Sequence, residues 1–170
     1  MEVLEAIHPK RAIREFKPTP LPPEAVRTIL NAGRRAQSWK NSQPWQFVAL
    51  QNRETLEALA RLGPFAGHLA GAALGVVIVT PDPAERWSIP FDAGQAAAYM
   101  QLAALELGIG SCLASLYEPA AARDLLGIPA DSFPNVAISF GYPRDETAFK
   151  AGLRPSGRTS LDKVVHWDRW

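Results

Sequence analysis

Ala36-Gln37-Ser38-Trp39-Lys40-Asn41-Ser42-Gln43-Pro44-Trp45-Gln46-Phe47 joins two elements of different periodicity. Before it, Pro22-Pro23 is typical of a helix start, and apolar residues recur at helical spacing from Val26 to about Ala36. After it, Pro44 to Leu50 is rich in aromatic and branched residues, which predicts a strand. The polar loop between them offers the mixed hydrogen-bond donors and acceptors that a polyol or a heteroaromatic edge requires. On composition alone, an ordinary turn is favoured.

The rest of the chain alternates predicted helices and strands. A short first helix precedes Lys10, and the later expected elements are a helix at 53–62, a strand at 75–80, a helix at 92–107, a strand at 111–116, a helix at 119–126 and a strand at 135–140. The helix at 92–107 is apolar nearly all round, which indicates a central or interface position. A polar loop of about fourteen residues and an aromatic tail, 159–170, follow. This order predicts an α/β or α+β sandwich.

Length and charge limit the function classes. The chain has 170 residues, enough for one compact domain over 1–170. Its formal net charge of +1 argues against a general nucleic-acid or anionic-membrane surface. A single cysteine, Cys112, excludes an internal disulfide. The acidic start shows no secretory signal, and the longest apolar run, 69–79, is too short to span a bilayer. We therefore expect a cytoplasmic protein without a membrane partner.

Two further stretches contain residues that are suited to binding a ligand. Lys10-Arg11-Ala12-Ile13-Arg14-Glu15-Phe16 places three cations within five residues, and guanidinium groups form bidentate hydrogen bonds to phosphate. Taken alone, such a run is more often a solvated basic face. Leu107-Gly108-Ile109-Gly110-Ser111-Cys112 sets two glycines at a helix-to-strand junction, where backbone N–H groups can approach a ligand. A plain C-cap and turn is an equal interpretation.

Together these stretches resemble the nitroreductase family. The family's Arg-Arg-Ser-x-Arg-x-Phe corresponds to 10–16, and its Ala-Pro-Ser-x-x-Asn-x-Gln-Pro-Trp-x-Phe corresponds to 36–47. Its Leu-Gly-x-Gly-Ser follows at 107–111, Leu-Leu-Gly-Ile-Pro at 125–129 and Gly-Tyr-Pro at 141–143. The ending from Gly157 to Trp167 is also similar. The resemblance spans nearly the whole chain in the expected order.

The resemblance implies an α+β fold, a three-layer α/β/α sandwich with a central, mostly antiparallel sheet, in a homodimer with exchanged C-terminal tails. It implies an FMN-dependent oxidoreductase that passes hydride from NADH or NADPH through flavin N5 to a small organic oxidant by a ping-pong mechanism. The implied cofactor-binding residues come from four parts of the chain. They are Lys10, Arg11, Arg14 and Arg158 around the phosphate and the polar edge of the flavin, Ser38, Trp39 and Asn41 toward the flavin of the other subunit, and Gly110 and Ser111 along the ring. No catalytic side chain is implied, because the flavin carries the hydride.

Two residues depart from the family pattern. Ala12 stands where a phosphate-binding serine is usual, and Gln37 stands where proline is usual. Neither change removes a charge, so we expect FMN binding to survive both.

Several residues that could have a catalytic or metal-binding role also have a structural interpretation. Cys112 fits a small core residue, and His8, His68 and His166 lack ligand spacing, so no metal site is expected. His68 is either structural or part of a substrate pocket. Trp87 and Phe91 fit a lid, core packing or an interface.

Three alternatives stay open on the sequence. The chain is an FMN-binding module without nicotinamide turnover, a non-flavin nucleotide-binding protein, or a specialised branch of the family with dehalogenase, flavin-cleaving or dehydrogenase activity.

Overall fold

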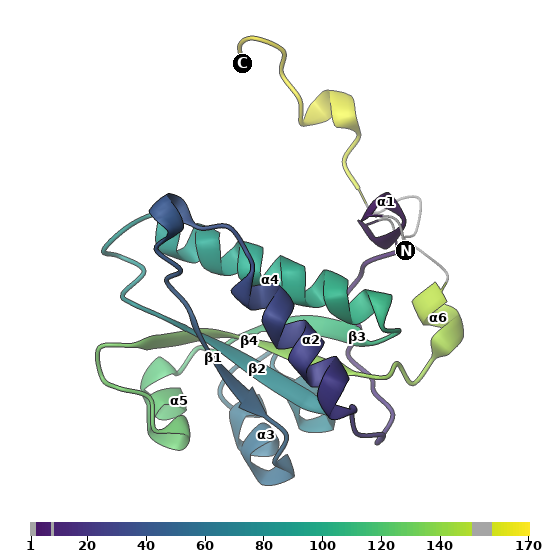
Figure 1. Cartoon of the computed structure of the whole chain (residues 1–170), viewed down its shortest axis with the longest axis vertical. Coiled ribbons are helices and arrows are strands. Elements are labelled where there is room, and N and C mark those ends of the chain that lie inside the picture. Colours follow the sequence, from purple (N-terminus) through teal and green to yellow (C-terminus); the bar gives the residue numbers. More distant parts are fainter. Residues whose placement is uncertain (1–2, 8, 151–157) are drawn as a thin grey trace.

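The computed structural model describes residues 3–7, 9–150 and 158–170, and its centre is a four-stranded sheet. The strands are β1 (Gln46–Leu50), β2 (Leu74–Thr80), β3 (Gly110–Ser115) and β4 (Phe133–Gly141), in the order β1-β2-β4-β3 (Figure 1). Every neighbouring pair of these strands is antiparallel. The predicted α+β fold with a mostly antiparallel sheet is therefore confirmed.

Helices cover both faces of the sheet (Figure 1). On one face lie α2 (Pro23–Arg34) and α4 (Ser88–Glu106), whose Ile29 and Met100 share a core with Ile138 of β4. On the other face lie α3 (Arg53–Ala60) and α5 (Pro119–Leu126), whose Leu59 and Ala122 pack with Ala137. Since successive strand residues point to opposite faces, adjacent β4 residues serve different cores. The result is the expected α/β/α layering.

A glycine lets α2 approach α4 closely. A Cβ atom built on Gly33 would lie 2.2 Å from Cε of Met100, which is closer than real Cβ contacts. The alanine-rich sequence of α4 serves the same close packing.

The basic segment that follows α1 (Val3–Ile7) runs along the edge of the sheet. Ala12 forms a parallel bridge with Ser111 of β3, and Phe16 forms an antiparallel bridge with Pro143. The N–H of Ile13 donates to the carbonyl of Ser111 at 3.0 Å. Because Phe16 is buried, the segment is anchored and its cations are held against β3.

Several predicted boundaries are wrong. The polar loop expected after Pro143 contains a helix, α6 (Glu146–Lys150), and Lys17 forms an ion pair with Glu146 at 2.5 Å. That contact joins positions far apart in the sequence, so no local pattern indicates it. Helix α4 starts at Ser88 rather than at Asp92. Three 3₁₀ turns were also missed, namely η1 (Trp39–Asn41), η2 (Gly67–Gly71) and η3 (Leu161–Lys163).

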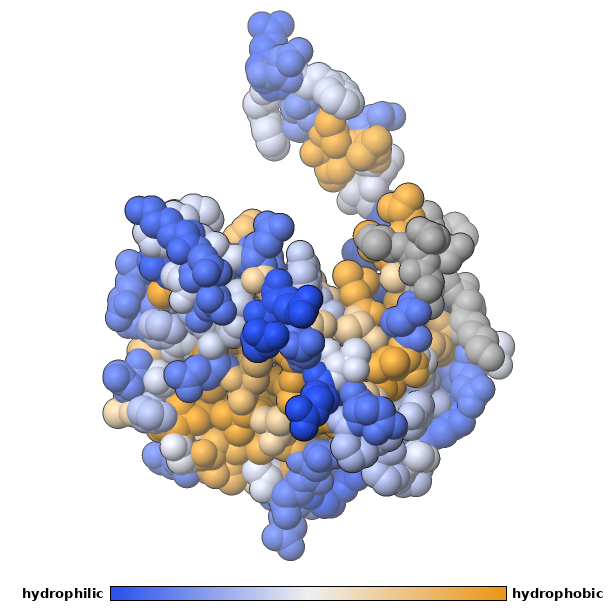
Figure 2. Space-filling model, viewed as in Figure 1, coloured by the Kyte–Doolittle hydropathy of each residue, from blue (hydrophilic) through white to orange (hydrophobic). Residues whose placement is uncertain are grey.

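The C-terminal residues 158–170 extend away from the sheet and helices (Figure 1). Trp167 is 82% exposed and Trp170 is 98% exposed, while Leu161 and Val164 give the tail an apolar patch (Figure 2). No helix among the described residues is long and apolar enough to cross a membrane.

Candidate functional site

Three of the predicted cofactor-binding residues line one pocket. Lys10, Arg11 and Arg158 surround a cavity of about 380 Å³ beside the middle of α4, together with Ile7, Ala12, Ala98, Gln101 and Leu102. None of these lining residues is acidic. Burial lowers the pKa of the Lys10 ammonium from its ordinary value, and the nearby Cys112 thiol opposes that effect. The pocket therefore favours an anion, which would offset the cost of placing these cations together.

Arg14 lies at the same sheet edge but does not line this pocket. Burial raises the pKa of the Cys112 thiol, whereas the charge of Arg14, that of Lys10 and a hydrogen bond from Arg14 lower it. The Arg14 guanidinium therefore sits beside β3. Cys112 itself is free and buried, as expected for a small core residue.

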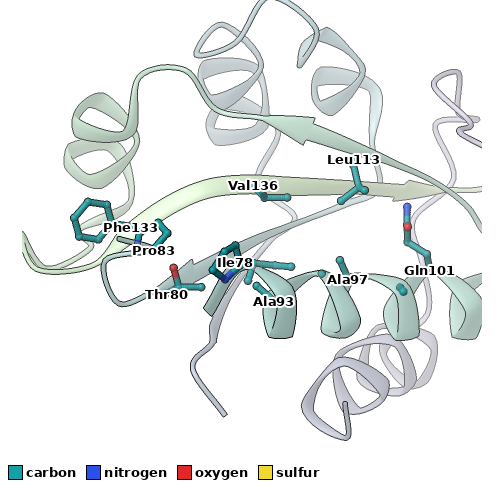
Figure 3. A pocket seen from close by; sticks show the side chains of 12 residues that line it. Ile78, Thr80, Pro83, Ala93, Ala97, Gln101, Leu113, Phe133 and Val136 are labelled. Carbon is teal, nitrogen blue, oxygen red and sulfur yellow. The ribbon is translucent and has the colours of Figure 1, made fainter. Parts of the chain in front are cut away.

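An apolar pocket of about 300 Å³ adjoins the basic one between α4 and the sheet (Figure 3). Ala93, Ala97 and Gln101 face it from α4, and Leu113 faces it from β3 (Figure 3). Ala98 and Gln101 line both pockets, so the two hollows are neighbours on one helix. A flat apolar ring joined to an anionic group matches this pair of surfaces.

Gly110 and Ser111 lie underneath the basic segment. Ser111 is 2% exposed, and a Cβ atom on Gly110 would lie 2.8 Å from Cβ of Ile13. Neither residue lines the basic or the apolar pocket. Their geometry positions the segment that carries Lys10 and Arg14, and their role along a flavin ring stays a prediction.

The loop with Ser38, Trp39 and Asn41 is held in a defined conformation by hydrogen bonds. The N–H of Trp39 donates to Oδ2 of buried Asp92 at 3.1 Å, and the N–H of Gln43 donates to Oγ of Ser38 at 2.9 Å. Lys40, Asn41 and Gln43 have φ values of +49°, +56° and +45°, which side chains disfavour. The interactions with Asp92 and Ser38 hold this strained turn in place.

This loop and the basic pocket lie at different points along α4. The loop contacts Asp92 near the start of the helix, whereas the basic pocket reaches Ala98 to Leu102, up to three turns further on. Neither pocket described above includes a residue of the loop. The two predicted residue sets are therefore separate within one chain.

The aromatic pair Trp87 and Phe91 packs edge to face at 6.0 Å between ring centroids, and both side chains are exposed. This excludes the core-packing interpretation for these two residues.

His68 has a structural position. Its Nδ1 lies 2.7 Å from Oγ of Ser139 in the buried interior, while its Nε2 has no hydrogen-bond partner. His166 is exposed and stacks on Trp170, and His8 lies outside the described residues, as does Gly157 of the C-terminal motif. Over the part of the chain that the structure describes, no group of three metal-ligating side chains comes together.

Sequence reasoning missed Asp92 and Gln101 as site residues. Both are buried polar side chains on a largely apolar helix. That interruption of the apolar pattern was the available signal, because a buried polar group needs a partner or a ligand.

The geometry agrees with what comparison with known proteins shows. The model of the nitroreductase family matches residues 7–66 and 63–142. The chain belongs to this family. It is 30% identical, over 99% of both chains, to an Archaeoglobus fulgidus protein whose name places it among the NADH dehydrogenase/NAD(P)H nitroreductases.

Solved structures of similar proteins have the same fold as this nitroreductase-family chain. An FMN-dependent nitroreductase from Clostridium difficile has a TM-score of 0.83 at 29% identity, covering 95% of this chain and 96% of that one. A Bacteroides thetaiotaomicron structure, named in the same way as the archaeal relative, has a TM-score of 0.85 at 25% identity, covering 98% and 97%. The protein is thus an NAD(P)H nitroreductase-like oxidoreductase.

Proposed function

We propose that this chain is a single-domain, FMN-dependent enzyme that passes hydride from NAD(P)H to a small organic oxidant in the cytoplasm. The observation that carries this proposal is the basic pocket beside the apolar one. FMN has an apolar ring system linked by a polyol to a phosphate, and the lining residues offer cations without acids next to an apolar hollow. The donor set therefore fits the cofactor.

Each residue set has a proposed role. Lys10, Arg11 and Arg158 hold the phosphate through charge-assisted hydrogen bonds. Arg14, at the β3 edge, interacts with the polar edge of the flavin, where a cation stabilises the negative charge of the reduced ring. Gly110 and Ser111 run along the ring.

We also propose that the site is completed by a second copy of the chain, with exchanged C-terminal tails. Phe91 and Tyr99 are exposed on α4, and the tail exposes both of its tryptophans. So much apolar surface indicates a protein interface. In this dimer Ser38, Trp39 and Asn41 of the partner subunit close the flavin site, which agrees with their separation from the basic pocket within one chain.

Bound FMN supplies the acceptor and donor of hydride, so the protein contributes binding and orientation. No general base is required. Nicotinamide and oxidant occupy the same place in turn, and we therefore expect ping-pong kinetics.

The test begins with purified protein. A yellow protein with an FMN-like spectrum supports the cofactor, and a colourless one that does not take up added FMN contradicts it. NADH and NADPH are then screened against quinones, nitroaromatics and free flavin. Bound FMN without oxidation of either nicotinamide would identify a binding module instead. Turnover restricted to dehalogenation, flavin cleavage or dehydrogenation would identify a specialised branch.

Riboflavin tests the phosphate site directly. Arg158→Ala should weaken FMN binding by roughly 1.5–3 kcal/mol, the range for a lost charge-assisted contact. Riboflavin has no phosphate, so its affinity should change less. Equal losses for both ligands would move Arg158 from the phosphate to the ring or polyol.

A further inference from the structure

Two cations gather on one exposed indole ring. Nζ of Lys40 lies 4.6 Å from the Trp39 ring centroid, and Cζ of Arg86 lies 4.6 Å from the same centroid. Trp39 is 43% exposed, so this group of three side chains, which we name the indole cluster, is open to solvent. Two positive charges beside one ring repel each other, and an anion bound between them would offset that repulsion.

The Arg86 side chain is fixed in direction. Its Nε donates to Oγ of Ser88 at 2.7 Å, and its Nη2 donates to Oγ of Ser42 at 3.1 Å. The bond to Ser42 ties the segment before α4 to the loop after α2, and the bond to Ser88 ties it to the first residue of α4. Both partners are neutral hydroxyls. Over the described ranges neither Arg86 nor Lys40 has a carboxylate partner, so the cluster keeps its net positive charge.

The position of the indole cluster indicates which anion it would bind. The proposed function sets Ser38 and Asn41 beside the flavin of the partner subunit, where the nicotinamide must stack. Trp39 and Lys40 lie between those two residues in the same turn. The rest of a dinucleotide must extend outward from the nicotinamide across nearby surface, and it carries phosphate groups.

We propose that Lys40 and Arg86 bind a phosphate group of the reduced nicotinamide dinucleotide. The inference rests on the proposed function, because it needs the nicotinamide beside this loop. Arg86 presents a guanidinium that the serines and the indole hold in place, which suits bidentate recognition of a phosphate. Lys40 adds a second charge. The phosphate is either the 2′-phosphate of NADPH or the diphosphate common to NADPH and NADH.

The experiment compares hydride donors on the FMN-loaded protein. NADPH, NADH and the phosphate-free donor 1-benzyl-1,4-dihydronicotinamide are tested with wild type, Arg86→Gln and Lys40→Gln. We expect the KM for a phosphate-bearing donor to rise at least about tenfold in Arg86→Gln, as a lost charge-assisted contact implies. The benzyl donor should be unaffected. Arg86→Lys keeps the charge but not the two-pronged guanidinium, so it should recover only part of the loss. Arg61→Gln, an exposed arginine after α3, is the matched control.

The pattern of loss identifies the phosphate. A loss with NADPH alone assigns the 2′-phosphate, and equal losses with NADPH and NADH assign the diphosphate. Unchanged KM values for both dinucleotides overturn the proposal. An equal loss with the benzyl donor also overturns it, because the residues then act on the flavin or on the fold.

A binding measurement separates this inference from the proposed function. Calorimetric titration of the same variants with NADP⁺ and NAD⁺ reads phosphate recognition without turnover. If wild type oxidises no donor, the proposed function fails, and the titration still tests the cluster. If wild type turns over NAD(P)H and Arg86→Gln binds both nucleotides like wild type, only the inference fails.

Discussion

At the scale of single residues, the burial of His68 makes the stability of the fold depend on pH. Its ring is buried and bonded to Ser139, with the other nitrogen unpartnered. Burial lowers the pKa of His68 from its ordinary value of 6.5, the nearby backbone of Leu113 opposes this effect, and the charge of Arg14 adds to it. The folded protein therefore holds His68 neutral near neutral pH.

This predicts a loss of stability in acid. In the unfolded chain His68 takes up a proton below its ordinary pKa, while the folded chain resists it, so the free energy of unfolding falls as pH drops below about 6.5 toward the lower folded pKa. Urea unfolding across this pH range measures the slope. His68→Gln should flatten it, and the exposed His166→Gln should not. An unchanged slope in His68→Gln would contradict the assignment.

At the scale of elements, the packing of the basic segment on β3 depends on the absence of a side chain at Gly110. An added Cβ would meet the Cβ of Ile13 rather than the end of a flexible chain. Gly110→Ala should therefore push the segment away, lengthen its bond to Ser111 and cost about 1–3 kcal/mol in unfolding free energy. FMN affinity should fall with it, since Lys10 and Arg14 would move.

A double-mutant cycle gives the control for this element. Ile13→Ala removes the colliding atoms beyond Cβ, so Gly110→Ala should cost less in that background. Unfolding and FMN titration of the four proteins measure the coupling. Simple additivity would show that Cγ1 and Cγ2 of Ile13 do not limit the space at Gly110.

At the same scale, some features of the fold could be predicted from the sequence and others could not. The order of α1 to α5 and β1 to β4 could be predicted, because each element carries its own period or start signal. The shape of the Ser38 to Gln43 loop could not. Three residues other than glycine adopt positive φ there, and the acceptor that holds Trp39 is Asp92, over fifty positions away. The apolar pocket was likewise hidden, because it arises where α4 and the sheet leave a space.

At the scale of the whole molecule, the exposed tail predicts dimer dependence. Deleting Val165 to Trp170 should weaken the dimer and lower FMN occupancy together, because the tail is proposed to cover apolar surface on the partner. Sedimentation and flavin absorbance measure the two effects. A stable, flavin-loaded monomer of the full chain at micromolar concentration would contradict the dimer model.

The proposal that two subunits share each site makes a further prediction. Substitutions in the two residue sets can affect the same site of a dimer or two different sites, depending on which subunits are combined. In an Arg14→Ala/Arg158→Ala homodimer both sites lose a cation at the phosphate and a cation at the flavin edge, and in a Ser38→Ala/Asn41→Ala homodimer both sites lose the closing side chains of the loop. Each homodimer should be nearly inactive.

Mixing the two variants changes the count of intact sites. In a heterodimer one site receives both defects, while the other combines an intact basic pocket with an intact loop. The heterodimer should therefore recover about half of wild-type turnover, as two equivalent sites in a symmetric dimer require. Differently tagged subunits, purified through both tags, give the defined species, and mass measurement proves exchange. If the proven heterodimer stays as inactive as its parents, both residue sets serve the same chain's flavin, and the separation of the loop from the basic pocket along α4 then needs a movement within one subunit.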